Sequence, residues 1–386
     1  MAITGDQALV KKINKTIILN TIREHAPLSR ANVSTLSGLN KATVSNLVAE
    51  LIDGHLVTEL GPGESSGGRK PLMLLFNKHA GYAVGLEVSV KRIRGVLTDL
   101  AGAIIAEDVQ PLTSHDVSYV CSSIVSMTNG LQLQAPPSPH GIIGVGIGVP
   151  GMVDEEGTVL FAPNLGWNMV PLRSMLEKEL ELPVTIDNEA NAGALGELHF
   201  GAARGTRHLI YISAGIGIGS GIVIDGELYK GAWGYAGETG HMSIDAEGKQ
   251  CSCGNRGCWE LYASEKAYDE ASLQLPSRST SDLTILAAKG DPVILELYKS
   301  MGHRLGVGIT NIVNSFNPER IIIGGPLSKA QKYIESSLQR VVAERTLPYH
   351  RRSLHIEFAE LGANSTLIGS AYGAISQFLG QIRVRS

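Results

Sequence analysis

The sequence predicts an α/β protein with a small helical domain at its N-terminus. Apolar residues recur at helical spacing as far as residue 52, which indicates packed helices. After residue 80, short apolar strands alternate with Gly-rich turns and longer helical stretches, the pattern of an α/β body. With 386 residues, of which 43% are hydrophobic, the chain can bury more than one core, so we expect two or three domains.

Charge separates the N-terminal domain from the body. Residues 1–80 contain nine Lys and Arg against six Asp and Glu, whereas the whole chain contains 33 against 37. The basic N-terminal segment is therefore suited to phosphates, and the body is acidic. No apolar run approaches the roughly 18 residues that a membrane helix needs. Since no export signal is recognisable either, we expect a cytoplasmic protein.

Three helices are predicted in the N-terminal domain. The first spans Leu9–His25 and ends before Pro27, and the second spans Ser29–Leu36 with Ser29 as its N-cap. Gly38 supplies the turn to a third helix, for which Asn40 is the N-cap. One face of the third helix is apolar at helical spacing and is expected to pack inward: Val44, Leu47, Val48, Leu51 and Ile52.

The opposite face of the third helix carries small polar side chains after a tight turn, as DNA base edges in the major groove require. Apolar segments 56–60 and 72–76 flank the basic, Gly-rich segment 61–71, which predicts the hairpin wing of a winged helix. We expect Arg69 and Lys70 to contact phosphates or the minor groove. The other expected DNA contacts, in or beside the major groove, are Arg30, Lys41, Thr43, Ser45 and Asn46. The alternative interpretation of residues 1–78 is a helical protein-interaction domain with a disordered loop.

A cysteine-rich segment of the body predicts one structural zinc ion per chain. Cys251, Cys253 and Cys258 are three of the four cysteines, and with His241 they make the Cys3His set that a closed tetrahedral zinc site prefers. Three cysteines within eight residues, in a chain without a signal peptide, do not resemble an extracellular disulfide framework. Free thiols or a disulfide are the alternatives. Cys121, far along the chain, is interpreted as a buried apolar side chain.

Three motifs of the body, together with the N-terminal helices, resemble the ROK family of repressors and sugar kinases. The motifs are Asp187-Asn188-Glu189-Ala190-Asn191, Gly237-Glu238-Thr239-Gly240-His241 and the cysteine run that ends in Trp259-Glu260. The resemblance extends over essentially the whole chain. It implies a winged helix-turn-helix over residues 1–78, followed by an actin-like fold of two lobes. The small lobe would span 79–187 and include the C-terminal helix 370–386, and the large lobe would span 188–369.

The family resemblance implies that a sugar binds in a cleft of the body. By position, the side chains that would hold its hydroxyls are Asn164, Asn188, Glu189, Glu238, His241 and Glu260. Carboxylates and amides suit this task because they can form two hydrogen bonds to neighbouring hydroxyls. His241 would bind zinc through one ring nitrogen and the sugar through the other, so the metal would fix its tautomer. Ordinary solvated carboxylates are the alternative for Glu238 and Glu260.

The segments that handle phosphate in the kinases of this family are altered at three places. The first phosphate hairpin has Glu87, Ser89, Val90 and Lys91 where those kinases have an Asp, two glycines and a threonine. A side chain at the closest approach obstructs backbone N–H contacts with phosphate. In the Gly-rich segment Gly215–Gly221, Ile216 replaces a threonine hydroxyl, and Glu189 replaces the catalytic Asp, displacing the base by ~1 Å. We therefore expect no enzymatic activity, although Gly324-Gly325, on the adenosine side, is retained.

The sequence thus predicts a sugar-responsive transcriptional repressor that is released from operator DNA by an inducer. Segments 66–71 and 251–266 resemble the xylose-responsive members of the family in Gram-positive bacteria, so D-xylose is the expected inducer. We expect a homodimer or higher homo-oligomer, whose DNA-binding domains match two half-sites. One alternative is an active ROK kinase of glucose or an N-acetyl-hexosamine with an added DNA-binding domain. Another is a DNA-binding protein that does not respond to sugar.

Overall fold

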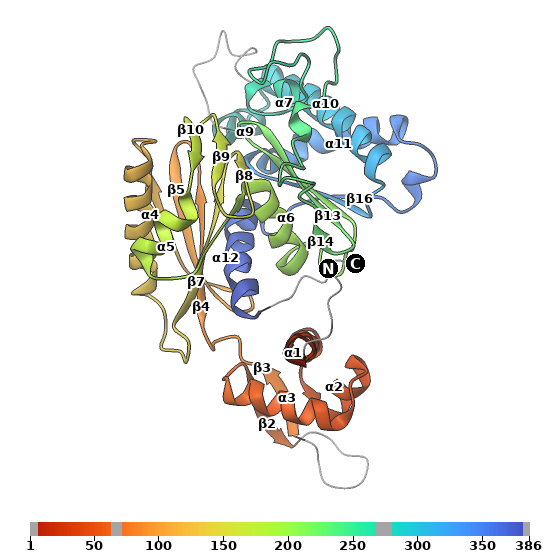
Figure 1. Ribbon diagram of the computed structural model, residues 1–386. Coiled ribbons are helices and arrows are strands. Elements are labelled where there is room, and N and C mark those ends of the chain that lie inside the picture. Colours follow the sequence, from red (N-terminus) through yellow and green to blue (C-terminus); the bar gives the residue numbers. More distant parts are fainter. Residues whose placement is uncertain (1–6, 63–71, 268–279, 381–386) are drawn as a thin grey trace.

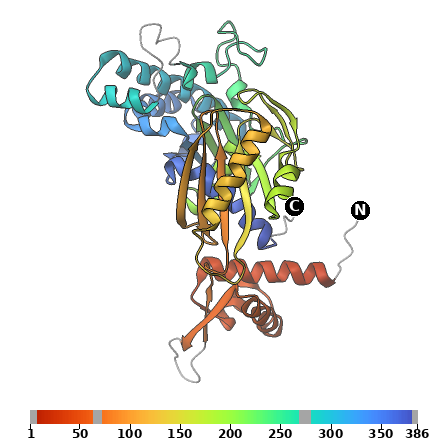
Figure 2. The same cartoon turned by 90° about the vertical axis from the view of Figure 1, so that its left-hand side faces the viewer.

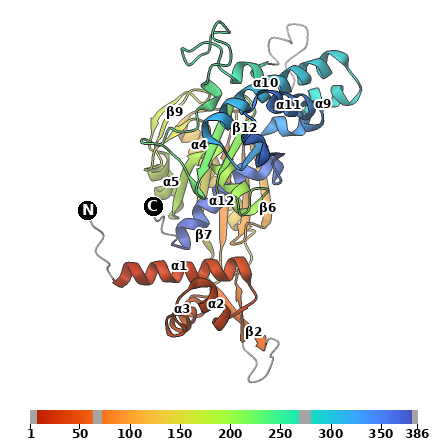
Figure 3. The ribbon, with the colours of Figure 1, turned by 90° about the vertical axis from the view of Figure 1, so that its right-hand side faces the viewer.

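The structure is a computed structural model that describes residues 7–62, 72–267 and 280–380. The N-terminal domain lies below a larger body (Figure 1). Two further views show helix α1 running across the lower end of the body (Figures 2 and 3). Arg69 and Lys70, which were predicted to contact DNA from the wing tip, lie outside the described residues.

The N-terminal domain contains the three predicted helices and a small sheet. The Ser29 hydroxyl accepts a hydrogen bond from the Asn32 N–H at 3.2 Å and caps the second helix, which Gly38 ends at a φ of 72°. The Asn40 carboxamide caps the third helix, as predicted. The strand order of the small sheet is β1-β3-β2. The elements of the domain are α1 (Gln7–His25), β1 (Leu28–Ser29), α2 (Arg30–Ser37), α3 (Lys41–Asp53), β2 (Val57–Pro62) and β3 (Leu72–Phe76).

The first lobe of the body is built on a five-stranded sheet of order β11-β7-β4-β5-β6. Strands β4, β5 and β6 form an antiparallel meander, and β7 and β11 extend it in parallel. Helices α4 and α5 bury their apolar residues against the sheet. The elements are β4 (Tyr82–Val88), β5 (Arg92–Asp99), β6 (Ile104–Pro111), α4 (Val117–Gln132), β7 (Ile142–Val149), α5 (Leu172–Leu180) and β11 (Val184–Asn188), with a separate small sheet of β8 (Met152–Val153), β9 (Val159–Ala162) and β10 (Trp167–Val170).

The second lobe has another five-stranded sheet, of order β14-β13-β12-β15-β16. Its apolar core includes residues of the long helices α10 and α11. The elements are β12 (Leu209–Ala214), β13 (Ile218–Ile224), β14 (Glu227–Leu228), α7 (Glu260–Ala263), α9 (Thr280–Ala288), α10 (Pro292–Phe316), β15 (Arg320–Gly324), α11 (Gln331–Arg345) and β16 (His355–Phe358), with short 3-10 helices η1 (Thr239–His241), η2 (Pro326–Ala330), η3 (His350–Arg352) and η4 (Gly362–Asn364).

Two helices, α6 (Glu189–Phe200) and α12 (Ser365–Phe378), lie between the two sheets (Figure 1). Glycines in the strands allow this close approach. A Cβ added to Gly146 of β7 would lie 1.8 Å from the Ser370 carbonyl oxygen of α12, and one added to Gly221 of β13 would lie 2.5 Å from the Ala190 oxygen of α6. The sheet–helix–sheet arrangement confirms the predicted α/β fold of two lobes. The C-terminal helix, predicted over 370–386, begins at Ser365 and ends at Phe378.

Only the first part of the Gly-rich segment Gly215–Gly221 is a turn. Strand β13 already begins at Ile218, so the turn contains only Gly215–Gly217. The glycines of the strand are explained by the neighbouring helix, because Gly219 and Gly221 both face α6 at contact distance. Their function in this part of the chain is packing.

Candidate metal and sugar site

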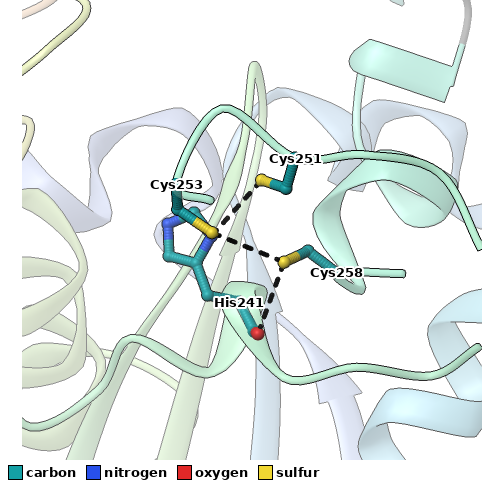
Figure 4. A group of neighbouring side chains, drawn as sticks. All are labelled: His241, Cys251, Cys253 and Cys258. Atoms are coloured by element: carbon teal, nitrogen blue, oxygen red, sulfur yellow. Dashed lines mark hydrogen bonds between the residues drawn. The ribbon is translucent and has the colours of Figure 1, made fainter. Parts of the chain in front are cut away.

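Three cysteine sulfurs and a histidine ring converge between η1 and α7 (Figure 4). The ligand atoms of His241, Cys251, Cys253 and Cys258 all lie within 4.8 Å of one another. The Cys253 and Cys258 sulfurs are 3.7 Å apart, and His241 Nδ1 lies 3.8 Å from the Cys251 sulfur. All four cysteines of the chain are free, so the disulfide alternative is wrong. The Cys3His cluster could hold a metal ion.

A buried tryptophan fastens the cysteine segment to the second lobe. Trp259 has no exposed surface, and its indole N–H donates to the Arg304 carbonyl oxygen of α10 at 3.0 Å. The ring covers Gly308, where an added Cβ would lie 2.0 Å from a ring atom. Gly257 has a φ of 67° and also lacks room for a side chain. The segment that carries Cys258 and Glu260 is therefore packed against α10 through Trp259, which fixes the direction of both side chains.

Glu260, predicted to bind sugar, lies beside the cysteine cluster. Only 4% of its surface is exposed. Its Oε1 accepts from the Lys266 ammonium at 2.7 Å and lies 3.5 Å from the Cys251 sulfur and 3.8 Å from His241 Nδ1. Its Oε2 faces Gly217, where an added Cβ would approach to 2.7 Å. Lys266 was not predicted as a partner of Glu260, because the resemblance of segment 251–266 assigned no role to its last residue.

Strand β13 brings the remaining predicted sugar residues toward the cluster. The Ser220 N–H and hydroxyl donate to the Gly237 carbonyl oxygen at 3.0 and 2.9 Å, and the hydroxyls of Ser220 and Thr239 are 3.0 Å apart. These bonds lay the segment that carries Glu238 and His241 along β13, and the glycines of the same strand contact the start of α6. Residues from three separate motifs thus meet around the beginning of β13.

Asn188 is the N-cap of α6. Its carboxamide oxygen accepts from the Ala190 N–H at 2.7 Å, and its Nδ2 donates to the Gly151 carbonyl oxygen at 2.8 Å. An amide nitrogen has two hydrogens, so one further donor is available to a ligand. The preceding Asp187 accepts from the Lys230 ammonium at 2.6 Å. Lys230 was also missed from the sequence, because a lysine in a Gly-rich loop carries no signal of an ion pair.

Glu189, the first residue of α6, is a partly buried carboxyl group near a second one. Burial, helped by the neighbouring Glu87 carboxylate, raises its pKa to about 7. Glu87 lies 3.4 Å from the Arg94 guanidinium, yet burial raises the pKa of Glu87 as well. A carboxyl group with such a pKa is protonated in part near neutral pH, so Glu189 can donate or accept a hydrogen bond to a hydroxyl.

Comparison with known proteins decides the family. The ROK family model matches residues 83–377. The chain belongs to the ROK family. It is 42% identical to the xylose repressor of Bacillus spizizenii, over 98% of this chain and 99% of that protein. The structure is similar to that of a ROK transcriptional regulator homologous to Escherichia coli Mlc, with a TM-score of 0.83 and 29% identity over 96% of this chain and 97% of the other.

A ROK glucokinase is similar to about three quarters of this chain. The enzyme from Streptomyces griseus, solved with glucose and AMPPNP, has a TM-score of 0.67 and 29% identity over 76% of this chain and 98% of its own. The ROK family model likewise begins at residue 83. The body therefore resembles a sugar kinase, which confirms the predicted two-lobed fold of the body.

The other predicted residues of this ROK protein lie at two exposed places. Asn164 is exposed between β9 and β10 of the small three-stranded sheet. In the N-terminal domain, Lys41, Ser45 and Asn46 are exposed on α3, and Thr43 is half-buried. The last predicted DNA contact, Arg30, forms a salt bridge with Glu59 of β2 and so joins α2 to the wing.

The two segments that were predicted to be altered phosphate loops form hydrogen bonds within the chain. The Ser89 N–H and hydroxyl both donate to the Arg92 carbonyl oxygen, at 2.9 and 2.8 Å, and the Val90 carbonyl oxygen lies 2.8 Å from His115 Nε2. In the second segment the Gly215 N–H donates to the Gly217 carbonyl oxygen at 3.0 Å.

No helix among the described residues is both long and apolar enough to cross a membrane.

Proposed function

We propose that this ROK protein is a transcriptional repressor that binds operator DNA and is released by D-xylose. Its similarity to the Bacillus spizizenii xylose repressor, which covers both the N-terminal domain and the body, carries this proposal. The structural likeness to a ROK transcriptional regulator over nearly the whole chain supports it. Binding of operator DNA by the purified chain, and its loss on addition of D-xylose, tests it.

The proposed DNA contact is the exposed polar face of α3. Lys41 and Asn46 would reach the phosphate backbone and base edges, with Ser45 and Thr43 beside them. The salt bridge with Glu59 fixes the direction of the Arg30 side chain, which would contact the DNA backbone beside the wing. Arg69 and Lys70, outside the described residues, are proposed to contact phosphates or the minor groove. Two such domains in a homodimer would match two half-sites.

The proposed inducer site surrounds the beginning of β13. Asn188, Glu189, Glu238, His241 and Glu260 would hold the sugar there, and Asn164 would close the site from the first lobe. D-Xylose as a pyranose presents several adjacent hydroxyls and no exocyclic hydroxymethyl group. Amide and carboxyl groups that can form two hydrogen bonds each are suited to such a ligand. The domain boundaries proposed are 1–78, 79–187 and 188–369, with α12 completing the first lobe.

Zinc is the metal proposed for the Cys3His cluster. A tetrahedral zinc with Zn–S distances of about 2.3 Å holds its sulfurs about 3.8 Å apart, and the Cys253–Cys258 separation is 3.7 Å. His241 would bind it through Nδ1, which already faces the cluster, leaving Nε2 for a sugar hydroxyl. The metal would supply structure rather than chemistry, because a Cys3His set leaves no ligand position for a substrate.

The alternative, an active sugar kinase with a DNA-binding domain, is favoured by the likeness of the body to a glucokinase. Against it, the hairpin of Ser89, Val90 and Lys91 forms hydrogen bonds to Arg92 and His115, and Ile216 supplies no hydroxyl. Glu189, with a pKa near 7, could still accept a proton. The case against phosphoryl transfer therefore depends on the phosphate loops. Formation of ADP in the presence of xylose or glucose tests this alternative.

A further inference from the structure

Helices α6 and α12 form a continuous connection between the candidate sugar site and the N-terminal domain. Helix α6 begins at Asn188 and Glu189 in the site, and it ends at His199 and Phe200, toward the N-terminal domain. Helix α12 runs beside it and contributes to the apolar cluster that also contains α1. Figure 1 shows the two helices side by side between the sheets, with α1 below the end of α12.

The two helices are packed backbone against backbone. A Cβ added to Gly369 of α12 would lie 1.7 Å from the Ala192 carbonyl oxygen of α6, and one added to Gly196 of α6 would lie 2.3 Å from the Ser365 oxygen of α12. The Thr366 hydroxyl also donates to the carbonyl oxygen of Glu189 at 3.1 Å. Because no side chain separates the helices, they cannot slide independently, and a displacement of Glu189 also displaces α12.

The first contact of this helix pair with the N-terminal domain is made by two stacked rings and an arginine. The rings of His199 and Tyr372 are stacked, with centroids 3.8 Å apart and an interplanar angle of 18°. The Arg23 guanidinium of α1 lies near both: it helps burial to lower the pKa of His199 to about 3, so this histidine is neutral. The other side of Arg23 covers the Phe76 ring of β3 at 5.5 Å. Arg23 thus joins α1 and β3 to the ends of α6 and α12.

The second contact leads directly to the end of the proposed recognition helix. Gly54 follows α3 as its C-cap, and its carbonyl oxygen lies 2.9 Å from His140 Nε2. The His140 ring packs edge-on against Phe378, the last residue of α12, with centroids 5.1 Å apart. Beside it, Ile375 and Leu379 belong to the same apolar cluster as Ile18 and Ile22 of α1. The C-terminal end of α12 therefore shares an apolar cluster with α1, and His140 connects it to Gly54, the C-cap of α3.

We propose that α6 and α12 move as one unit when sugar occupies the site, and that this unit repositions α3 through the contacts of Arg23 with His199 and Tyr372 and of His140 with Gly54 and Phe378. This inference depends on the proposed function, because it assumes that sugar and DNA bind the same chain. It assigns the coupling between the two sites to residues that contact neither ligand.

The test measures the coupling factor, which is the operator dissociation constant at saturating D-xylose divided by that without sugar. His140→Ala removes an exposed side chain. The matched control is His355→Ala, because His355 is the exposed first residue of β16. The operator is the duplex that the wild-type protein selects from a random-sequence library. We expect His140→Ala to keep the xylose affinity of the wild type and to lower the coupling factor about threefold or more, while His355→Ala keeps the wild-type factor.

His199→Ala, at the other contact, gives a second measurement in case His140→Ala no longer binds operator. Wild-type coupling factors in both His140→Ala and His199→Ala would overturn the inference while leaving the proposed function intact. A wild-type protein that binds operator equally well with and without xylose would overturn the proposed function, and this inference with it. The two failures are thereby distinguished in one set of titrations.

Discussion

The Lys230 ammonium lies 2.6 Å from the Asp187 carboxylate and joins the loop after β14 to the start of α6. Both side chains are about one-fifth exposed, at 19% and 21%. The other oxygen of Asp187 accepts from the backbone N–H of Asn188 at 2.8 Å and from Asn191 Nδ2 at 3.0 Å. One ion pair therefore sets the position of Asn188 relative to the segment that carries Glu238.

Lys230→Met should weaken sugar binding. The partly buried Asp187 carboxylate would lose its cation and turn toward water, which displaces Asn188. We expect the dissociation constant for D-xylose, measured by calorimetry, to rise about tenfold. Lys230→Arg should restore most of the affinity. Lys299→Met is the control, because the Lys299–Glu296 pair on α10 is exposed. An unchanged xylose affinity in Lys230→Met would show that the pair does not position the site.

Removal of the metal should abolish the response to sugar before it abolishes DNA binding. The cluster adjoins Glu260 and includes His241, whereas α3 belongs to the separate N-terminal domain. We expect Cys258→Ser to contain less than one zinc per chain by elemental analysis, and to bind operator with nearly wild-type affinity in the presence of xylose. Cys121→Ser, in the first lobe, should keep both zinc and the response. A zinc-free protein that still responds to xylose would refute the role given to the cluster.

Glu189→Gln should change how stability depends on pH. Burial, with the help of Glu87, raises the pKa of Glu189 from 4.5 to about 7, so the folded state favours the protonated carboxyl. Below pH 4.5 the group is protonated in both folded and unfolded chains. As the pH rises from 4.5 to about 7, the unfolded chain releases this proton while the folded chain retains it, so stability falls over this interval and levels off above it. We expect Glu189→Gln to be more stable than the wild type at pH 8 by about 1–2 kcal/mol.

Urea unfolding at pH 5 and pH 8 measures this difference. At pH 5 the two proteins should differ less than at pH 8, because most of the pH interval over which the wild type loses stability lies above pH 5. Glu319→Gln, an exposed substitution, should follow the wild type at both values. The assignment fails if Glu189→Gln gains no stability between pH 5 and pH 8.

Two substitutions on α3 should affect DNA binding in different ways. Asn46→Ala should cost about 1–3 kcal/mol and relax the preference for operator over other sequences, since a base contact is lost. Lys41→Ala should weaken binding to all duplexes alike and reduce the salt dependence of the affinity, since a phosphate contact is lost. Fluorescence anisotropy at several salt concentrations separates these effects. If neither substitution lowers the affinity, α3 is not the DNA-reading helix.

Local signals were sufficient for the helices of the N-terminal domain, and remote contacts explain what the sequence did not reveal. Ser29, Gly38 and Asn40 cap or end helices through groups only a few residues away, so their pattern is legible. The glycines of β13, by contrast, serve the approach of α6, which lies at least 18 residues earlier in the chain. A Gly-rich segment alone does not distinguish such packing from a turn.

The candidate site shows the same division. The four residues of the Cys3His cluster were recognisable because three of them stand within eight residues and their chemistry is distinctive. The pairs Asp187–Lys230 and Arg30–Glu59 were not, because each joins two ordinary charged residues from distant segments. The structure was also needed to show that the carboxamide oxygen of Asn188 caps α6.

The most direct test of the whole account is a reciprocal titration. Operator binding is measured with and without saturating D-xylose, and xylose binding is measured with and without saturating operator. If the chain is a sugar-responsive repressor, xylose weakens operator binding, and operator weakens xylose binding by the same factor. Equal operator affinities in the two conditions would contradict it.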